Sequence, residues 1–372
     1  MKLQGVELRR INMPLLSPFR TSFSVQTSRD VLLLRAVTDE AEGWGECVAM
    51  ADPLYSSEYV DATADVLRRF FLPALAAAPE ALAQHGATAV GQVLHPFKGH
   101  RMAKAALEMA VLDAELRAAD RSFGRELGAV HDRVPSGVSV GIYDEIPALL
   151  DAVGGYLDAG YLRIKLKIEP GWDIEPVKAV RERFGDDLLL QVDANTAYSL
   201  RDARHLAKLD DFGLLLIEQP LEEEDVLGHA ELATLISTPI CLDESIVSAQ
   251  SAAAAIKLGA CSIINIKPGR VGGYLEAVRI HDVAAAHGVA AWCGGMLETG
   301  LGRAANAALA ALPGFTLPGD VSASDRFYAT DITEPLRIVD GHMPVPTGPG
   351  LGVTPLPELL DEVTTTVEWV AL

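Results

Sequence analysis

Short apolar runs separated by amphipathic stretches fill the chain from about residue 135 onward. The runs are GVSVG (137–141), RIKLKI (163–168), LLLQVDAN (188–195), LLLIEQP (214–220), PICLDES (239–245), IINIKPG (263–269), AAWCGG (290–295) and a weaker FTLPGD (315–320). Strands that alternate with helices form parallel sheets, and eight nearly continuous apolar strands favour a closed α/β barrel. An open doubly wound sheet is the alternative, but no G-x-G-x-x-G motif opens a helix after the first strand.

The first third of the chain has a different pattern. Residues 1–38 alternate as strands do, with a hairpin turned at 39–43, and apolar residues then recur at helical spacing over about 57–77 and 100–119. The Pro- and Gly-rich tail holds enough Leu and Val to pack, although a disordered tail is the alternative. We therefore expect three parts: an α+β domain (1–134), a barrel (135–324) and a segment returning to the first domain (325–372).

Composition narrows the function classes. The chain has 372 residues with 31 Lys+Arg and 51 Asp+Glu, a formal net charge of −20. This acidity argues against nucleic acid and anionic membrane surfaces as partners. No apolar run approaches the roughly 18 residues of a membrane span. The N-terminus lacks a signal-peptide core, and four scattered cysteines suit a reducing compartment, so we expect a cytoplasmic protein.

Ionisable residues interrupt the ends of five successive apolar runs. Lys167, Asp193, Glu218, Asp243 and Lys267 follow one another at steps of 26, 25, 25 and 24 residues, which is one strand–helix unit each time. In a barrel these side chains fall at the carboxyl ends of adjacent strands, which is the catalytic face. A buried structural ion network is the alternative, since a charged residue in a strand core needs a partner.

The three acids in this set predict a metal site. Carboxylates converging on one point repel one another, and all-oxygen ligands favour Mg²⁺, Mn²⁺ or Ca²⁺ over zinc. We expect Asp193, Glu218 and Asp243 to be the ligands. Glu244 follows directly and either turns inward, where it supports a lysine from behind, or forms a salt bridge to a neighbouring strand.

The lysines predict general-base chemistry. Lys165 and Lys167 are two residues apart and project to the same side of a strand, so their ammonium groups should depress each other's pKa, and a metal should depress it further. Lys267 arrives from the far side of the ring. A carboxylate substrate between two such lysines suits proton abstraction at its α-carbon, whereas Schiff-base chemistry leaves the three acids without a role.

These residues resemble those of the enolase superfamily, in its muconate-lactonizing-enzyme subgroup, over the whole chain. The match is nearest to the N-acylamino acid racemase and o-succinylbenzoate synthase branch. The segments that carry it include PFRTSF (18–23), GWGECVAM (43–50), PLYSSEY (53–59), RIKLKIEPGWD (163–173), QVDANT (191–196), LLIEQPLEEED (215–225), CLDESI (241–246), NIKPGRVGG (265–273) and GDVSASDRF (319–327). The resemblance implies a (β/α)7β TIM-like barrel with an N-terminal α+β capping domain that the C-terminal tail completes.

The resemblance also implies roles for single residues. Lys167 would remove the α-proton, Lys267 would serve the opposite face in racemisation, and Lys165 would make Lys167 less basic. In the synthase reaction, the dehydration of a cyclohexadiene carboxylate (SHCHC), Lys167 would return its proton to the departing hydroxyl while Lys267 stays protonated. Asn195 would contact the substrate carboxylate or the metal shell. Ser139 would face the substrate, or else be a small core residue.

Loops above the barrel should set the specificity. The segments 17–27 and 48–56 read as loops, and their apolar residues suit an acyl chain or a ring, although scattered core aromatics are the alternative. The substrate-contacting residues expected in the loops and after the seventh strand are Phe19, Phe23, Met50, Tyr55, Gly295 and Met296.

The sequence thus predicts a metal-dependent isomerase/lyase without an organic cofactor. The resemblance implies that it racemises N-succinyl or N-acetyl amino acids through an enediolate and also acts as an o-succinylbenzoate synthase, the latter a step of menaquinone biosynthesis. Alternatives are a cycloisomerase, a dipeptide epimerase, whose D-x-D motif is absent after Asp320, and a non-catalytic barrel. The expected partner is a small-molecule carboxylate, and the resemblance implies a homo-oligomer, a dimer or an octamer.

Overall fold

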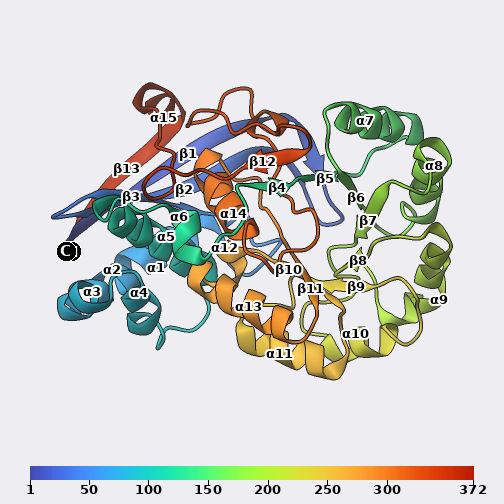
Figure 1. The fold of residues 1–372 in the computed structure, drawn as a ribbon, viewed down its shortest axis with the longest axis horizontal. Coiled ribbons are helices and arrows are strands. Elements are labelled where there is room, and N and C mark those ends of the chain that lie inside the picture. The colour runs from blue at the N-terminus through green and yellow to red at the C-terminus, as the bar shows by residue number, and fades with distance from the viewer.

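A four-stranded antiparallel sheet builds the N-terminal domain of the computed structural model, which describes residues 1–372 (Figure 1). Its strand order is β13-β1-β2-β3, with β1 Leu3–Arg20, β2 Val25–Thr38, β3 Glu42–Cys47 and β13 Thr364–Ala371. The helices of this domain are α1 Val60–Val66, α2 Leu72–Ala76, α3 Pro79–His85, α4 Thr88–Val93, α5 Arg101–Ala118 and α6 Phe123–Leu127, with a π-helical turn over Leu67–Phe71 between α1 and α2.

Two glycines let the sheet lie directly on α5. A Cβ on Gly43 would stand 2.1 Å from the backbone nitrogen of Ala114, and one on Gly45 would stand 2.0 Å from the carbonyl oxygen of Ala106. Both glycines therefore serve close backbone approach rather than a turn. This contact fixes β3, whose end leads into the segment 48–56 above the barrel.

Seven parallel strands form the curved sheet of the second domain (Figure 1). In spatial order from the first edge they are β5 Gly137–Val140, β6 Arg163–Lys167, β7 Leu189–Asp193, β8 Ile217–Glu218, β9 Ile240–Leu242, β10 Ile263–Ile266 and β11 Ala290–Cys293. The helices around them are α7 Ile146–Asp158, α8 Ile174–Phe184, α9 Ala203–Leu206, α10 Val226–Leu232, α11 Ala249–Leu258, α12 Pro268–Val271, α13 Tyr274–Ala286 and α14 Gly300–Ala310. The predicted α/β barrel with its N-terminal domain is confirmed.

The eighth predicted strand closes this barrel without forming a regular ladder. Residues 315–320 make only two isolated bridges, Phe315 with Ala291 of β11 and Gly319 with Ser136 just before β5. Hydrogen bonds from Asp320 N to Cys293 O (2.9 Å) and from Gly137 N to Gly319 O (2.8 Å) join both edges. Pro318 has no N–H to donate, which is consistent with the short pairing.

The segment 17–27 is less loop-like than its sequence suggests. β1 continues to Arg20 and β2 begins at Val25, with Phe19 paired to Gln26, so only 21–24 form the turn of a long hairpin. The segment 48–56 contains no helix or ladder strand, as expected. The prediction of a loop over 17–27 is therefore wrong at both ends, where cross-strand pairing extends the strands.

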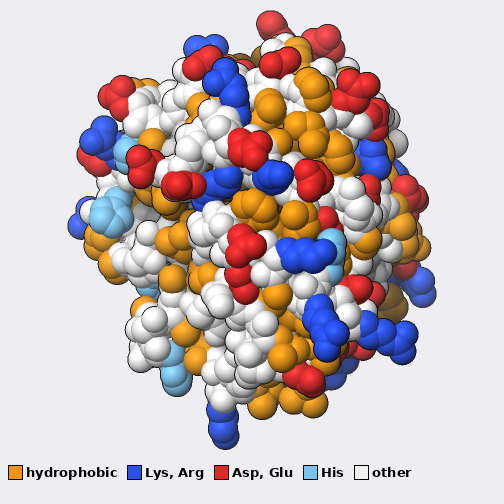
Figure 2. Space-filling view, turned by 90° about the vertical axis from the view of Figure 1, so that its right-hand side faces the viewer, with side chains coloured by type: hydrophobic (Ala, Val, Ile, Leu, Met, Phe, Trp, Pro, Cys, Tyr) orange, Lys and Arg blue, Asp and Glu red, His pale blue; other side chains and the backbone are white.

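The tail runs back across both domains. β12 (His342–Pro344) pairs with β4 (Arg133–Pro135), α15 spans Pro357–Val363, and β13 pairs antiparallel with β1. No helix is both long enough and apolar enough to cross a membrane. On the face that carries α7 to α9, acidic and basic side chains are interspersed (Figure 2), so the excess negative charge forms no single patch there.

Candidate active site

Five buried ionisable side chains meet at the carboxyl ends of β6 to β10. Lys167 ends β6, Asp193 ends β7 and Glu218 ends β8, while Asp243 and Lys267 directly follow β9 and β10. None of the five is more than 7% exposed. Register places Lys167 beside Asp193, and Asp193 beside Glu218. The 25-residue steps of the sequence thus become neighbouring positions on one rim of the barrel.

Lys165 lies at the centre of a group of carboxylates. Its Nζ lies 2.7 Å from Asp320 Oδ2, 2.9 Å from Glu218 Oε2 and 3.1 Å from Asp193 Oδ2. Burial lowers the pKa of Lys165, but the charges of these three acids outweigh it and raise the pKa above its ordinary value. The expected depression by a second lysine therefore does not hold for Lys165 in this structure.

Lys167 is held by a chain of polar contacts. Its Nζ lies 2.6 Å from Asp193 Oδ2 and donates to Asn195 Oδ1 at 2.7 Å, and Asn195 Nδ2 donates to Glu244 Oε1 at 2.9 Å. Glu244 thus turns inward, reaches the lysine through Asn195 and forms no salt bridge to a neighbouring strand. Burial, with the charge of Asp243 next in size, raises the pKa of Glu244 to about 8.

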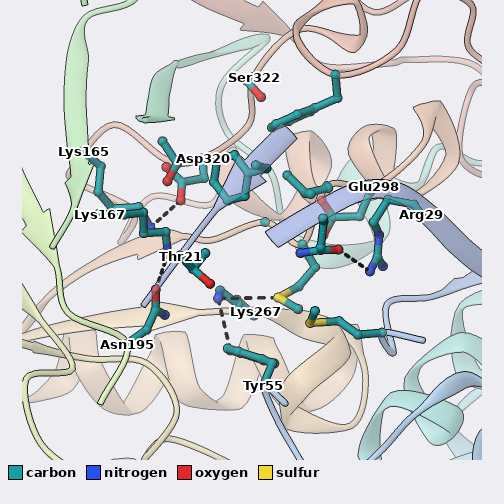
Figure 3. A pocket seen from close by; sticks show the side chains of 18 of the residues that line it. Thr21, Arg29, Tyr55, Lys165, Lys167, Asn195, Lys267, Glu298, Asp320 and Ser322 are labelled. Carbon is teal, nitrogen blue, oxygen red and sulfur yellow. Dashed lines mark hydrogen bonds and ion pairs between the residues drawn. The ribbon is translucent and has the colours of Figure 1, made fainter. Parts of the chain in front are cut away.

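Lys267 faces this group from across the barrel, since β10 stands four strands from β6. Its Nζ lies 3.1 Å from the Tyr55 hydroxyl (Figure 3), 2.7 Å from Asp243 Oδ2 and 3.6 Å from Met296 Sδ. Burial lowers the pKa of Lys267, but Asp243 and its other acidic neighbours raise it well above the ordinary value. Arg270 holds the second oxygen of Asp243 through its Nε at 2.8 Å.

The three acids have the chemistry of a hard-cation site. Burial, followed by the charges of Asp193 and then Asp243 from the two neighbouring strands, raises the pKa of Glu218 well above its ordinary value, as expected for carboxylates that repel one another. A divalent cation relieves such repulsion. The three acids do not stand as a cluster that could hold a metal ion without movement of side chains, and each of them is paired with a lysine. The donor set fits a metal, with the lysines as competing cations.

One cavity of about 650 Å³, counting the space open to solvent, is lined by Lys165, Lys167 and Lys267 (Figure 3) but not by Asp193, Glu218 or Asp243. All eight substrate-contacting residues expected from the sequence line it: Phe19, Phe23, Met50, Tyr55, Ser139, Asn195, Gly295 and Met296. The Ser139 hydroxyl is buried without a partner. Tyr55 differs from its expected apolar role, because its hydroxyl contacts Lys267 and both oxygens of Asp243.

Sequence reasoning missed several polar residues of the cavity wall: Thr21, Gln26, Arg29, Glu298, Arg303 and Ser322. Asp320, expected only to mark the absence of a D-x-D motif, neutralises Lys165. A signal existed for Arg29, which occupies a core-facing position of β2 just before the apolar run Val31–Leu34. Burying a charged side chain at such a position costs folding free energy unless it has a partner, so a buried arginine there indicates a binding role.

Comparisons with known proteins agree with this geometry. Residues 4–128 match the N-terminal domain of mandelate racemase / muconate lactonizing enzyme, and residues 148–359 match the enolase C-terminal domain-like family. An N-succinylamino acid racemase from Amycolatopsis sp is 74% identical over 100% of both chains. The o-succinylbenzoate synthase of Bacillus subtilis is 43% identical over 95% of this chain and 94% of its own.

A solved structure supports the same assignment. A member of the enolase superfamily from Listeria innocua superposes with a TM-score of 0.93, with 38% identity over 100% of this chain and 99% of that one. Both domains, the strand-end residues and full-length relatives therefore lead to one conclusion. The chain is an enzyme that belongs to the enolase superfamily, in its mandelate racemase and muconate lactonizing enzyme group.

Proposed function

We propose that this enzyme racemises N-acylamino acids, with N-succinyl and N-acetyl amino acids as substrates, and that it also dehydrates SHCHC to o-succinylbenzoate. Enzymes of this superfamily use a divalent metal. The observation that carries the proposal is that Lys167 ends β6 and Lys267 directly follows β10, four strands away, and that both line one cavity. The names of the full-length relatives from Amycolatopsis and Bacillus subtilis support the substrate class.

Asp193, Glu218 and Asp243 would hold the ion, for which Mg²⁺ or Mn²⁺ suits three carboxylates. When bound, it supplies Lewis-acid stabilisation of the negative charge that develops on the substrate carboxylate. Lys165 balances the same charges from β6, because it pairs with Asp193 and Glu218. Glu244 orients Asn195, and Asn195 orients Lys167.

Racemisation needs one proton acceptor and one proton donor on opposite faces of the α-carbon. A neutral Lys167 would take the α-proton from one face and leave an enediolate. A charged Lys267 would then give its own proton to the other face, and the reverse reaction exchanges these roles. In the dehydration Lys167 would take the α-proton and pass it to the leaving hydroxyl, while Lys267 stays charged and stabilises the enediolate.

Proton exchange tests this assignment face by face. Each enantiomer of N-succinylphenylalanine is incubated in D₂O with the Mg²⁺-loaded wild type, Lys167→Ala or Lys267→Ala, and loss of the α-proton signal is followed by NMR. We expect both variants to lose racemisation. Each should still exchange the α-proton of the one enantiomer whose proton faces the remaining lysine.

Two outcomes contradict the proposal. Normal racemisation by either variant refutes the two-base assignment. Wild type that turns over neither N-acylamino acids nor SHCHC, yet epimerises dipeptides, moves the function toward that of the L-Ala-D/L-Glu epimerase of Bacillus subtilis, which is 30% identical over 84% of this chain. Circular dichroism of each variant shows whether an inactive protein is folded.

A further inference from the structure

A buried arginine without an anionic partner lines the cavity, away from Lys165 and Lys167 (Figure 3). Arg29 is only 2% exposed and forms no ion pair. Its Nη2 donates to the Val48 carbonyl at 3.2 Å and its Nη1 to Gln26 Oε1 at 3.3 Å, while its Nε is buried with no partner. A charge removed from water costs free energy unless an opposite charge meets it, so this guanidinium is suited to an anion.

The other cations of the cavity are already engaged. Lys165, Lys167 and Lys267 each lie within 3.1 Å of a carboxylate oxygen. Arg303 donates to the carbonyl oxygen of Glu298 at 2.6 Å and to that of Ser322. Arg29 differs from the three lysines because it has no carboxylate partner. It differs from Arg303 because both of its hydrogen bonds are 3.2 Å or longer.

The acidic groups nearby do not serve Arg29 either. Glu298 also lines the cavity, but its Oε1 accepts a hydrogen bond from Asn306 Nδ2 at 3.0 Å. Glu46 is occupied by Thr299 and Gly302 at the start of α14. No carboxylate of this chain therefore pairs with Arg29.

We propose that Arg29 binds the distal carboxylate of the substrate's acyl group, so that the enzyme selects acyl groups ending in a carboxylate over neutral ones. The inference rests on the proposed function, in which the α-carboxylate end of the substrate lies at the lysines. A guanidinium fork matches a carboxylate with two parallel hydrogen bonds. N-succinylamino acids and o-succinylbenzoate share a succinyl arm, and one such contact would serve both reactions.

The test varies the ligand and the residue together. The kcat/KM for racemisation is measured with N-succinylphenylalanine and with its terminal amide, the N-succinamyl analogue, which has the same shape without the charge. For wild type we expect the succinyl substrate to be favoured about 10- to 100-fold, the range of a charged hydrogen bond. Arg29→Gln should lose this preference because its kcat/KM falls for the succinyl substrate and stays the same for the succinamyl analogue. Arg29→Lys should keep part of the preference.

Arg35→Gln is the matched control. Arg35 lies on the same strand, but outside the cavity, and pairs with Glu7 at 2.6 Å and Glu42 at 3.0 Å. Its substitution should leave the ratio of the two substrates unchanged.

Two results overturn the inference while the proposed function stands. One is wild type that racemises the succinyl and succinamyl substrates equally well, a result that depends on no variant folding. The other is an Arg29→Gln or Arg29→Lys protein that loses both activities to the same extent, as expected if Arg29 only supports Val48. If wild type racemises no N-acylamino acid, the proposed function fails first and the role of Arg29 fails with it.

Discussion

Replacement of Glu46 by Gln should change how the stability of the protein depends on pH. Glu46 belongs to β3, and its carboxyl group reaches the start of α14 in the barrel domain. There it accepts hydrogen bonds from Thr299 N (2.9 Å), Thr299 Oγ1 (2.7 Å) and Gly302 N (2.9 Å). Burial, with the charge of Glu298 next in size, raises its pKa from the ordinary 4.5 to about 7 despite these donors. The folded protein therefore favours the protonated carboxyl.

The raised pKa of Glu46 sets both the sign and the size of its effect on the pH dependence of the unfolding free energy. Because the folded-state pKa is the higher one, Glu46 contributes its stability fully below about pH 4.5 and loses it as the pH rises through about 7. At about 1.36 kcal/mol per pH unit, the loss amounts to roughly 3 kcal/mol of unfolding free energy. Gln resembles the protonated acid at every pH, so Glu46→Gln should not show this loss.

Urea unfolding followed by circular dichroism, at several values between about pH 4.5 and 8, measures the difference between variant and wild type. We expect that difference to change by roughly 3 kcal/mol in favour of the variant as the pH rises, whatever its offset at low pH. Glu108→Gln should behave alike, because burial raises the pKa of Glu108 to about 7. A difference that stays constant over this range would refute the reasoning.

Three further predictions concern the site and the fold. Tyr55→Phe keeps the ring but removes the hydroxyl 3.1 Å from Lys267, so kcat should fall about tenfold while KM changes little. Proton exchange should slow only on the face served by Lys267, and equal loss on both faces would contradict this. Gly45→Ala should cost more than about 2 kcal/mol in urea unfolding because its Cβ meets Ala106 O at 2.0 Å, whereas Gly91→Ala, with nothing within 4 Å, should stabilise the protein slightly. Treatment with EDTA should abolish turnover and Mg²⁺ should restore it, and full activity after exhaustive chelation argues against the metal.

The periodic part of the molecule could be predicted from its sequence. A buried parallel strand is an almost continuous apolar run, and a strand–helix unit has a nearly constant length. The regular spacing of Asp193, Glu218 and Asp243 therefore predicts both the ends of their strands and their position on one rim of the barrel. Apolar residues such as Phe19 and Met50, in segments that read as exposed, likewise indicated the cavity wall.

Pairwise contacts between distant segments could not be predicted in this way. The pKa of Lys165 depends on Asp320, which comes from the irregular eighth segment, 155 residues later. Tyr55 seemed to offer only an apolar ring, because nothing in its local sequence tells that its hydroxyl meets Lys267. Side-chain electrostatics depends on which groups the fold brings within a few ångströms, and a pattern along the chain carries no such distances.

The pairing of β13 with β1 has a consequence for how the chain acquires its structure. Gly5 is paired with Ala371, so the outer strand of the N-terminal sheet leaves the ribosome only after the whole barrel has been synthesised. Until then β1 is an open edge, able to pair with β1 of another nascent chain. We therefore expect the first domain to be the last to mature, with its final strand added to a barrel that is already closed.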